Sequence, residues 1–167
     1  MRIEEEIKLD YSDVLFRPKR STLKSRKDVD LNRKYTFKHS RSSWKGIPII
    51  ASNMDGVGEI DVAKKLSSHK LMTALTKQHD INQIGTIYKR NIFLDSIALS
   101  CGTSKDSYNR LNSILKKYPK FKFICIDVAN GYSENFSNFV SEVRKKYPKK
   151  TIIAGNVVTA DMTQELV

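Results

Sequence analysis

The stretch KKYPKFKFICIDVAN at residues 116–130 is followed by a related stretch, KKYPKKTIIAGN, at residues 145–156. In each stretch, two lysines and a Tyr-Pro pair precede an apolar run. Lysines near the end of a helix interact favourably with its dipole, and proline ends a helix before the next strand begins. The offset of 29 residues between the two stretches suits one strand plus one helix. The repeat therefore predicts two consecutive βα units.

Five short apolar runs along the chain are strand candidates. They span residues 47–52, 71–75, 96–100, 121–127 and 151–156. Most of these runs are continuous, and a continuous run suits a strand buried on both faces, as in a parallel sheet. The intervening residues 60–66, 108–117 and 136–146 have the pattern of crossover helices.

Regular βα units are typical of either a doubly wound sheet or a (β/α)8 barrel, and their periodicity does not decide between the two. The first strand candidate lacks the GxGxxG phosphate fingerprint after it. Polar residues stand directly after the strand candidates, which favours a site at the carboxyl-terminal face of a barrel. These residues are Asn53, Asp55, Lys77, Thr103, Asp127, Asn130 and Asn156.

The composition indicates one soluble globular domain, because 40% of the 167 residues are hydrophobic and 29% are charged. No run approaches the roughly 20 apolar residues that a membrane span requires. The first ten residues, MRIEEEIKLD, are too acidic for a signal peptide. We therefore expect a cytoplasmic protein that does not associate with a membrane.

The formal net charge of +12 suggests a polyanionic partner such as nucleic acid. The basic residues, however, are spread over several expected helix ends, with one denser run at residues 17–27. No aromatic recognition motif is interleaved with them. The pattern predicts a solvated surface with a local anion site, and no nucleic-acid partner.

The two cysteines, Cys101 and Cys125, lie in or beside apolar runs. They have neither CxxC spacing nor a neighbouring histidine cluster. Buried cysteine usually behaves as a small hydrophobic residue. We expect two buried thiols and no metal site.

Residues 1–46 are polar, basic and weakly periodic, and we interpret them as an N-terminal arm and pre-barrel segment. Residues 47–167 are then a partial (β/α) barrel. The arm could cover the bottom of the barrel or reach a neighbouring subunit.

Several motifs together resemble the IMP dehydrogenase/GMP reductase family, in the family's order. They are DVLFRPKRSTLKSR from Asp13, FKHS from Phe37, PIIASNMDGVG from Pro48, CIDVANGYSE from Cys125 and AGNVV from Ala154. The run DVANGYS favours the GMP reductase branch. The resemblance covers the whole chain as the N-terminal half of such a protein.

The resemblance implies a (β/α)8 barrel, usually a homotetramer, that converts GMP to IMP and ammonia with NADPH as cofactor. Only about the first five βα units are present, so the nucleophilic cysteine loop is expected beyond Val167, and the chain alone is expected to be inactive. A potassium ion is possible in the full-length family, but its site is not in this chain. GMP and IMP are the implied substrate and product.

The resemblance also assigns site residues. Lys77 is implied to contact the cofactor and assist the chemistry, since a cation can hold an anionic or polar group in place. The residues implied to bind the cofactor are Ser25, Arg26, Lys77, Asp127, Val128 and Ala129. Those implied to lie near the substrate are Asn53, Met54 and Asn156.

Four of these residues have a structural alternative. Lys77 could be a solvated lysine at a strand end, and Asp127 could cap the helix that begins near Ser133. Arg26 could be an ordinary surface arginine, and Met54 a core residue.

Two departures from the family pattern affect the expected site. The usual MDTVG reads Met54-Asp55-Gly56-Val57-Gly58, which gives the turn more backbone freedom. The usual His-Lys-His-Tyr reads Thr76-Lys77-Gln78-His79, which keeps the lysine but removes two expected imidazoles.

A second hypothesis is that the chain is a truncated, non-catalytic product that binds nucleotides or regulates a partner. Five strands cannot close an eight-stranded barrel, so such a chain would expose two strand edges and an apolar interior. This liability favours the fragment interpretation.

Overall fold

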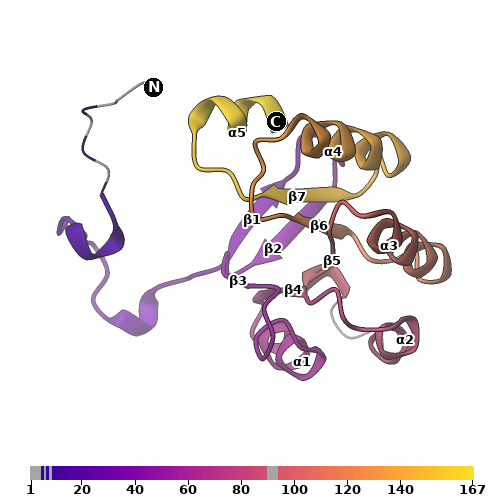
Figure 1. Cartoon of the computed structure of the whole chain (residues 1–167). Helices are drawn as coiled ribbons and strands as arrows, with labels where there is room; N and C mark the ends of the chain where they lie inside the picture. Colours follow the sequence, from indigo (N-terminus) through magenta and orange to yellow (C-terminus); the bar gives the residue numbers. More distant parts are fainter. Residues whose placement is uncertain (1–4, 6, 8, 90–93) are drawn as a thin grey trace. The chain divides into compact units, whose positions relative to one another are not determined.

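The five strand candidates form one parallel sheet in the computed structural model, which describes residues 5, 7, 9–89 and 94–167. The strands pair in sequence order and the sheet curls as part of a barrel (Figure 1). The strands are β3 (Ile50–Ala51), β4 (Met72–Leu75), β5 (Ile97–Cys101), β6 (Phe123–Asp127) and β7 (Thr151–Gly155). The expectation of a partial (β/α)8-type barrel with about five βα units is confirmed.

A helix follows each strand of this sheet. They are α1 (Ile60–Ser68), α2 (Ile81–Lys89), α3 (Lys105–Lys117), α4 (Glu134–Lys146) and α5 (Ala160–Leu166), and a 3-10 turn η3 (Leu94–Ser96) precedes β5. The three helices expected between strands are confirmed as α1, α3 and α4. The sequence interpretation missed α2, whose interior holds Gly85 and several β-branched residues with low helix propensity.

The strands read as continuous apolar runs because both faces of the sheet are covered. On β5, Leu99 packs with the helix layer, whereas the neighbouring Ala98 faces the barrel interior. The helix-side cluster also contains Leu75 and Ile124, and the interior cluster contains Phe123. Strands of parallel sheets are typically buried on both faces in this way, which explains why the continuous apolar runs predicted such a sheet.

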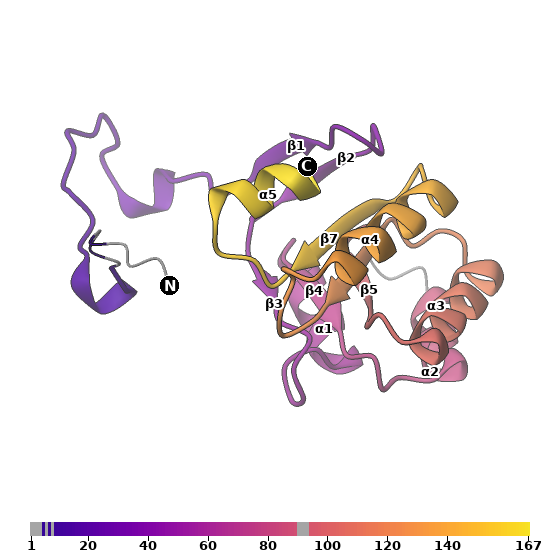
Figure 2. The same cartoon turned by 45° about the horizontal axis from the view of Figure 1, so that its top comes forward.

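Residues 33–46 form an antiparallel hairpin of β1 (Arg33–Thr36) and β2 (Ser43–Gly46), where the sequence suggested an extended arm. The hairpin lies on the side of the sheet opposite α1, α2 and α3 (Figure 1, Figure 2). Trp44 is only 5% exposed and packs in the interior cluster, and Phe37 meets Phe123 edge to face at 5.4 Å between ring centroids. The hairpin therefore covers the amino-terminal end of the barrel interior.

The chain divides into two compact units, Met1–Asp30 and Leu31–Val167. The hairpin belongs to the second unit, since its side chains complete the interior cluster. The expected division into residues 1–46 and 47–167 stays a prediction for the whole protein. The first unit contains two 3-10 turns, η1 (Tyr11–Asp13) and η2 (Arg26–Asp28), each closed by a capping box.

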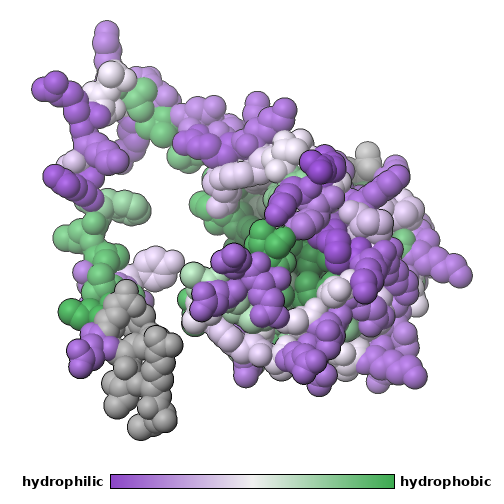
Figure 3. Space-filling view, turned by 90° about the horizontal axis from the view of Figure 1, so that it is seen from above, coloured by the Kyte–Doolittle hydropathy of each residue, from purple (hydrophilic) through white to green (hydrophobic). Residues whose placement is uncertain are grey.

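The two outer strands of the sheet, β3 and β7, each pair with one neighbour among the described residues. Ile50 of β3 is 47% exposed, and Ile49, which directly precedes this strand, is 59% exposed. Apolar side chains gather in a hollow of the second unit, bordered by hydrophilic ones (Figure 3). None of the helices in residues 9–89 and 94–167 combines the length and the apolar composition of a membrane span.

Candidate functional site

Three of the expected site residues follow different strands but lie at the same end of the sheet. Asn53 follows β3, Lys77 follows β4, and Asp127 ends β6. The Nδ2 of Asn53 donates to Oδ2 of Asp127 at 3.1 Å. The carboxyl ends of parallel strands meet at one face, which is where barrel enzymes carry their sites.

A cavity of about 640 Å³ opens at this face. Its lining contains four expected cofactor residues together with the β5–α3 loop and three residues of α3. The lining residues are Lys77, Gly102, Thr103, Ser104, Asp106, Ser107, Arg110, Asp127, Val128 and Ala129. A smaller cavity of about 200 Å³ shares Lys77 and Asp127 with it and adds Asn53, Asp55 and Thr76.

Asn156 lies beside the loop that follows β6. Its backbone N–H donates to the carbonyl of Val128, and its carbonyl accepts from the N–H of Gly131, both at 2.9 Å. These bonds join the end of β7 to the loop after Asp127. Met54 is 63% exposed in the β3–α1 loop, so the core alternative for this side chain is wrong.

Ser25 and Arg26 belong to the first unit, Met1–Asp30, whereas all residues that line this cavity belong to the second. Ser25 caps η2, with its Oγ accepting from Lys27 N at 3.2 Å and its own N–H donating to Asp28 Oδ2 at 2.9 Å. Both residues are exposed. Their cofactor role stays a prediction.

The sequence interpretation missed Arg110, a half-buried residue of α3 that lines the larger cavity. Its guanidinium donates to the carbonyl of His79, with Nε at 3.1 Å and a second bond from Nη2. No sequence signal marked Arg110, because its acceptors are carbonyl oxygens of His79 and Ser100, which only the packing of α3 brings near.

Comparison with known proteins gives the same family. Residues 8–167 match the model of the IMP dehydrogenase / GMP reductase domain. The chain belongs to this family. Proteins named GMP reductase from Yersinia enterocolitica and Shewanella pealeana are 50% and 49% identical to it over 169 aligned residues. A GMP reductase from Escherichia coli is 49% identical.

These alignments cover 100% of the chain but 49% of each of the three relatives, so the chain spans about half their length. It corresponds to their N-terminal half. The structure of an inosine 5' monophosphate dehydrogenase from Legionella pneumophila superimposes with a TM-score of 0.71 at 23% identity. That match covers 93% of this chain and 46% of the other, and it supports the barrel fold alone.

The structure shows the surroundings of both departures from the family pattern, Gly56 and the segment of residues 76–79. Gly56 has a φ of 74°, in the left-handed region that favours glycine over the usual threonine. At the second site, Thr76 is buried and Gln78 is exposed, while the imidazole of His79 is buried and lies 3.2 Å from Oε2 of Glu59. His79 thus anchors the loop that carries Lys77.

Gly58 fixes the turn that carries Asn53. A Cβ added at Gly58 would lie 2.6 Å from the carbonyl oxygen of Ala74 and 3.0 Å from Cα of Asn53. Because both neighbours are backbone atoms, we expect Gly58→Ala to lower the free energy of unfolding by about 1–3 kcal/mol. Urea denaturation measures this change. Gly102→Ala, which has space for a Cβ, is the control, and an equal loss in both variants would contradict the packing argument.

Cys101 and Cys125 are buried free thiols, as the sequence predicted. Burial raises the pKa of Cys101 to about 12 and also raises that of Cys125. Since the thiolate is the reactive form, we expect iodoacetamide to modify neither residue at neutral pH until the protein is unfolded. Peptide mapping by mass spectrometry tests this, and rapid labelling of either native thiol would contradict it.

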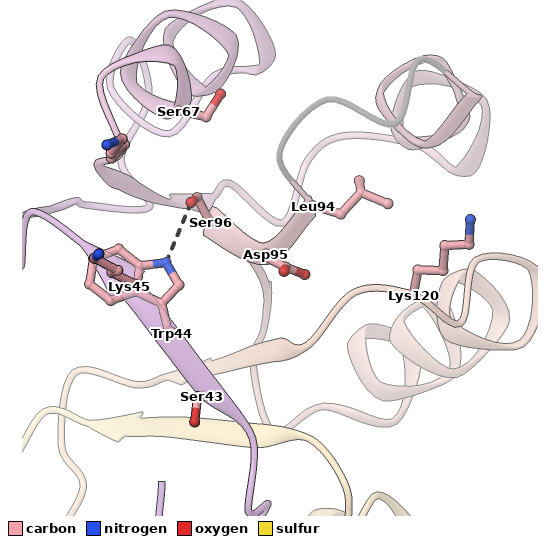
Figure 4. A pocket seen from close by; sticks show the side chains of 9 residues that line it. Ser43, Trp44, Lys45, Ser67, Leu94, Asp95, Ser96 and Lys120 are labelled. Atoms are coloured by element: carbon pink, nitrogen blue, oxygen red, sulfur yellow. Dashed lines mark hydrogen bonds between the residues drawn. The ribbon is translucent and has the colours of Figure 1, made fainter. Parts of the chain in front are cut away.

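A further cavity, of about 540 Å³, lies at the amino-terminal end of the sheet, beside the hairpin (Figure 4). Its lining includes Trp44, whose Nε1 donates to Ser96 Oγ at 3.4 Å, and the lysines Lys45, Lys70 and Lys120. It contains none of the expected site residues. In barrel enzymes this end serves stability, so we place the candidate site at the carboxyl-terminal end.

Proposed function

We propose that the protein carrying this chain is a GMP reductase, which converts GMP to IMP and ammonia with NADPH. The observation that carries the proposal is the cavity at the carboxyl-terminal face. Lys77, Asp127, Val128 and Ala129 line it together, although they come from two separate strands. The GMP reductases that match the chain at about half identity support the same assignment.

The residues of this cavity suit a nicotinamide dinucleotide. Lys77 supplies a cation for anionic or polar groups, and Asp127 supplies acceptors for hydroxyl or amide hydrogens. Ala129 allows close approach to the backbone. Oγ1 of Thr76 in the adjoining cavity is buried and has no hydrogen-bond partner among the described residues. Such an atom suits a ligand contact.

NADPH, when bound, supplies a hydride. In our proposal the residues of this chain hold the reactants. Lys77 positions the cofactor through its ammonium group, and Asn53 orients the carboxylate of Asp127 through their hydrogen bond. Met54 and Asn156 border the purine. We further propose that the nucleophilic cysteine lies in the half of the protein that follows Val167, so we expect these 167 residues alone not to turn over GMP.

The quaternary structure and location are also proposals. We infer a cytoplasmic homotetramer in which Ser25 and Arg26 contact NADPH bound to a neighbouring subunit. Arginine suits a phosphate or an adenosine ring. The arm also exposes large apolar side chains, among them Leu15 and Phe16, which a neighbouring subunit could cover.

The test is a steady-state assay of the complete protein. We expect NADPH absorbance to fall only when GMP is present, with IMP and ammonia formed in equal amounts. Oxidation of IMP with NAD⁺ and no reduction of GMP would contradict the proposal. Binding of GMP without turnover by the complete protein would instead favour the non-catalytic alternative.

A further inference from the structure

The loop that carries Lys77 joins β4 to α2 and is anchored at both ends. At its start, the N–H of Thr76 donates to the carbonyl of Gly58 at 2.9 Å. At its end, Asp80 caps α2, and Oδ1 of Asp80 accepts from the N–H of Gln83 at 2.8 Å. Lys77 lies between these anchors on an exposed turn.

The side chain of His79 ties this loop to α1. His79 is only 7% exposed. Its Nε2 lies 3.2 Å from Oε2 of Glu59 and 3.4 Å from the carbonyl oxygen of Gly58. A hydrogen on Nε2 therefore faces two acceptors at the start of α1, and the imidazole is held in one orientation.

The carbonyl of the same residue is tied to α3. Arg110 donates to it through Nε and Nη2, and Nη1 also lies 3.5 Å from the carbonyl of Ser100 on β5. Burial lowers the pKa of Arg110 from its ordinary value. A guanidinium nevertheless stays charged in proteins, and hydrogen bonds from charged donors are the stronger kind.

We propose that His79 and Arg110 form a clamp that fixes the backbone of residues 77–79 and so positions the ammonium of Lys77 over the cavity. The inference rests on the proposed cofactor role of Lys77. Two helices therefore contact the same residue: the start of α1 binds the imidazole of His79, and Arg110 of α3 binds its carbonyl. Both are positioning residues that act through Lys77.

The contacts explain how the chain keeps Lys77 in place without the two imidazoles that the family pattern carries there. His79 lies two positions after Lys77, and its side chain and carbonyl are both engaged. Because the two anchors leave the turn at Lys77 few free dihedral angles, the ammonium group is preorganised.

A double-mutant cycle in the complete enzyme tests the clamp. We expect Arg110→Gln to raise the Kd for NADPH about 10-fold, because several backbone hydrogen bonds are lost and the ammonium is no longer fixed. If Arg110 acts only through Lys77, the Lys77→Ala/Arg110→Gln protein binds NADPH as Lys77→Ala does. In Arg110→Gln we also expect a higher KM for NADPH and an unchanged KM for GMP.

Arg144 supplies the matched control. It is a half-buried arginine of α4 whose Nη1 donates to the carbonyl of Lys150 at 2.7 Å, outside this cavity. Arg144→Gln removes comparable bonds and leaves the Kd for NADPH unchanged. An equal loss of NADPH affinity in both arginine variants would overturn the inference, as would fully additive effects of Lys77→Ala and Arg110→Gln.

Amide hydrogen exchange of the cofactor-free enzyme separates the clamp from the proposed function. We expect Arg110→Gln to speed exchange in residues 76–80 and Arg144→Gln to leave it unchanged. Unaltered exchange in Arg110→Gln would overturn the clamp. Faster exchange, combined with normal NADPH affinity in Lys77→Ala, would support the clamp and reject the cofactor role of Lys77.

Discussion

Lys77→Ala in the complete enzyme is expected to lower kcat/KM for NADPH by about 100-fold, because the loss of a charged contact in a partly enclosed site costs about 2–3 kcal/mol. Lys77 lines both cavities at the carboxyl-terminal face, and Asp127 faces them from the next strand but one. Steady-state kinetics with NADPH varied at saturating GMP measures the effect. The charge matters more than the length of the side chain, so Lys77→Arg retains part of the activity.

The control for this substitution is Lys65→Ala, which removes an exposed lysine from α1. We expect its kcat/KM to match that of the unmodified enzyme. If Lys77→Ala turned over substrate at the rate of the Lys65→Ala control, the assignment of Lys77 to the cofactor site would be wrong.

Trp44→Ala is expected to lower the free energy of unfolding by about 3–5 kcal/mol, the range for removing a large buried aromatic side chain. Trp44 is a hairpin residue that is only 5% exposed and belongs to the interior cluster, together with Met72, Ala74 and Phe123. Its loss leaves a cavity that neighbouring small residues cannot fill. Urea denaturation followed by circular dichroism measures the change.

Tyr35 is the matched control for Trp44. The two residues are cross-strand partners in the hairpin and stack with 6.4 Å between ring centroids, but Tyr35 is 44% exposed. Tyr35→Ala is therefore expected to cost about 1 kcal/mol or less. Equal destabilisation by the two substitutions would mean that the hairpin does not cover the barrel interior.

The strands were predictable because both faces of the sheet are buried, which makes their apolar runs continuous. The KKYP stretches also located the ends of α3 at Lys117 and of α4 at Lys146. Helix α2 was missed because Gly85 lowers its helix propensity. Gly85 is explained only by the tertiary structure, since a Cβ there would collide with the hydroxyl of Tyr118.

The hairpin was missed for a related reason. Its buried strand positions are Trp44 and Gly46, and mostly polar or charged residues occupy the exposed strand positions, so it resembles a polar arm in sequence. Only the contact with the barrel interior distinguishes the two. Short strands that depend on one buried side chain give a weak periodic signal.

Some residues of the candidate site could be predicted from the sequence, and others could not. Asn53 and Lys77 follow strands and Asp127 ends one, and residues at the carboxyl ends of parallel strands meet at one face, so their proximity could be predicted. Arg110 projects from a helix to a carbonyl of another loop, a contact that depends on how α3 packs. Ser25 and Arg26 lie in the first unit, away from the strand ends that group the other residues in the sequence, so their cofactor role stays a prediction.

The most direct test of the central claim, that the carboxyl-terminal cavity holds NADPH, is hydrogen exchange of the complete enzyme with and without NADPH. We predict slower exchange in residues 76–80, 102–104 and 127–130, with no change around Trp44 and Lys120 at the opposite end. Protection confined to the opposite end, or no protection of the three loops at saturating NADPH, would contradict the account.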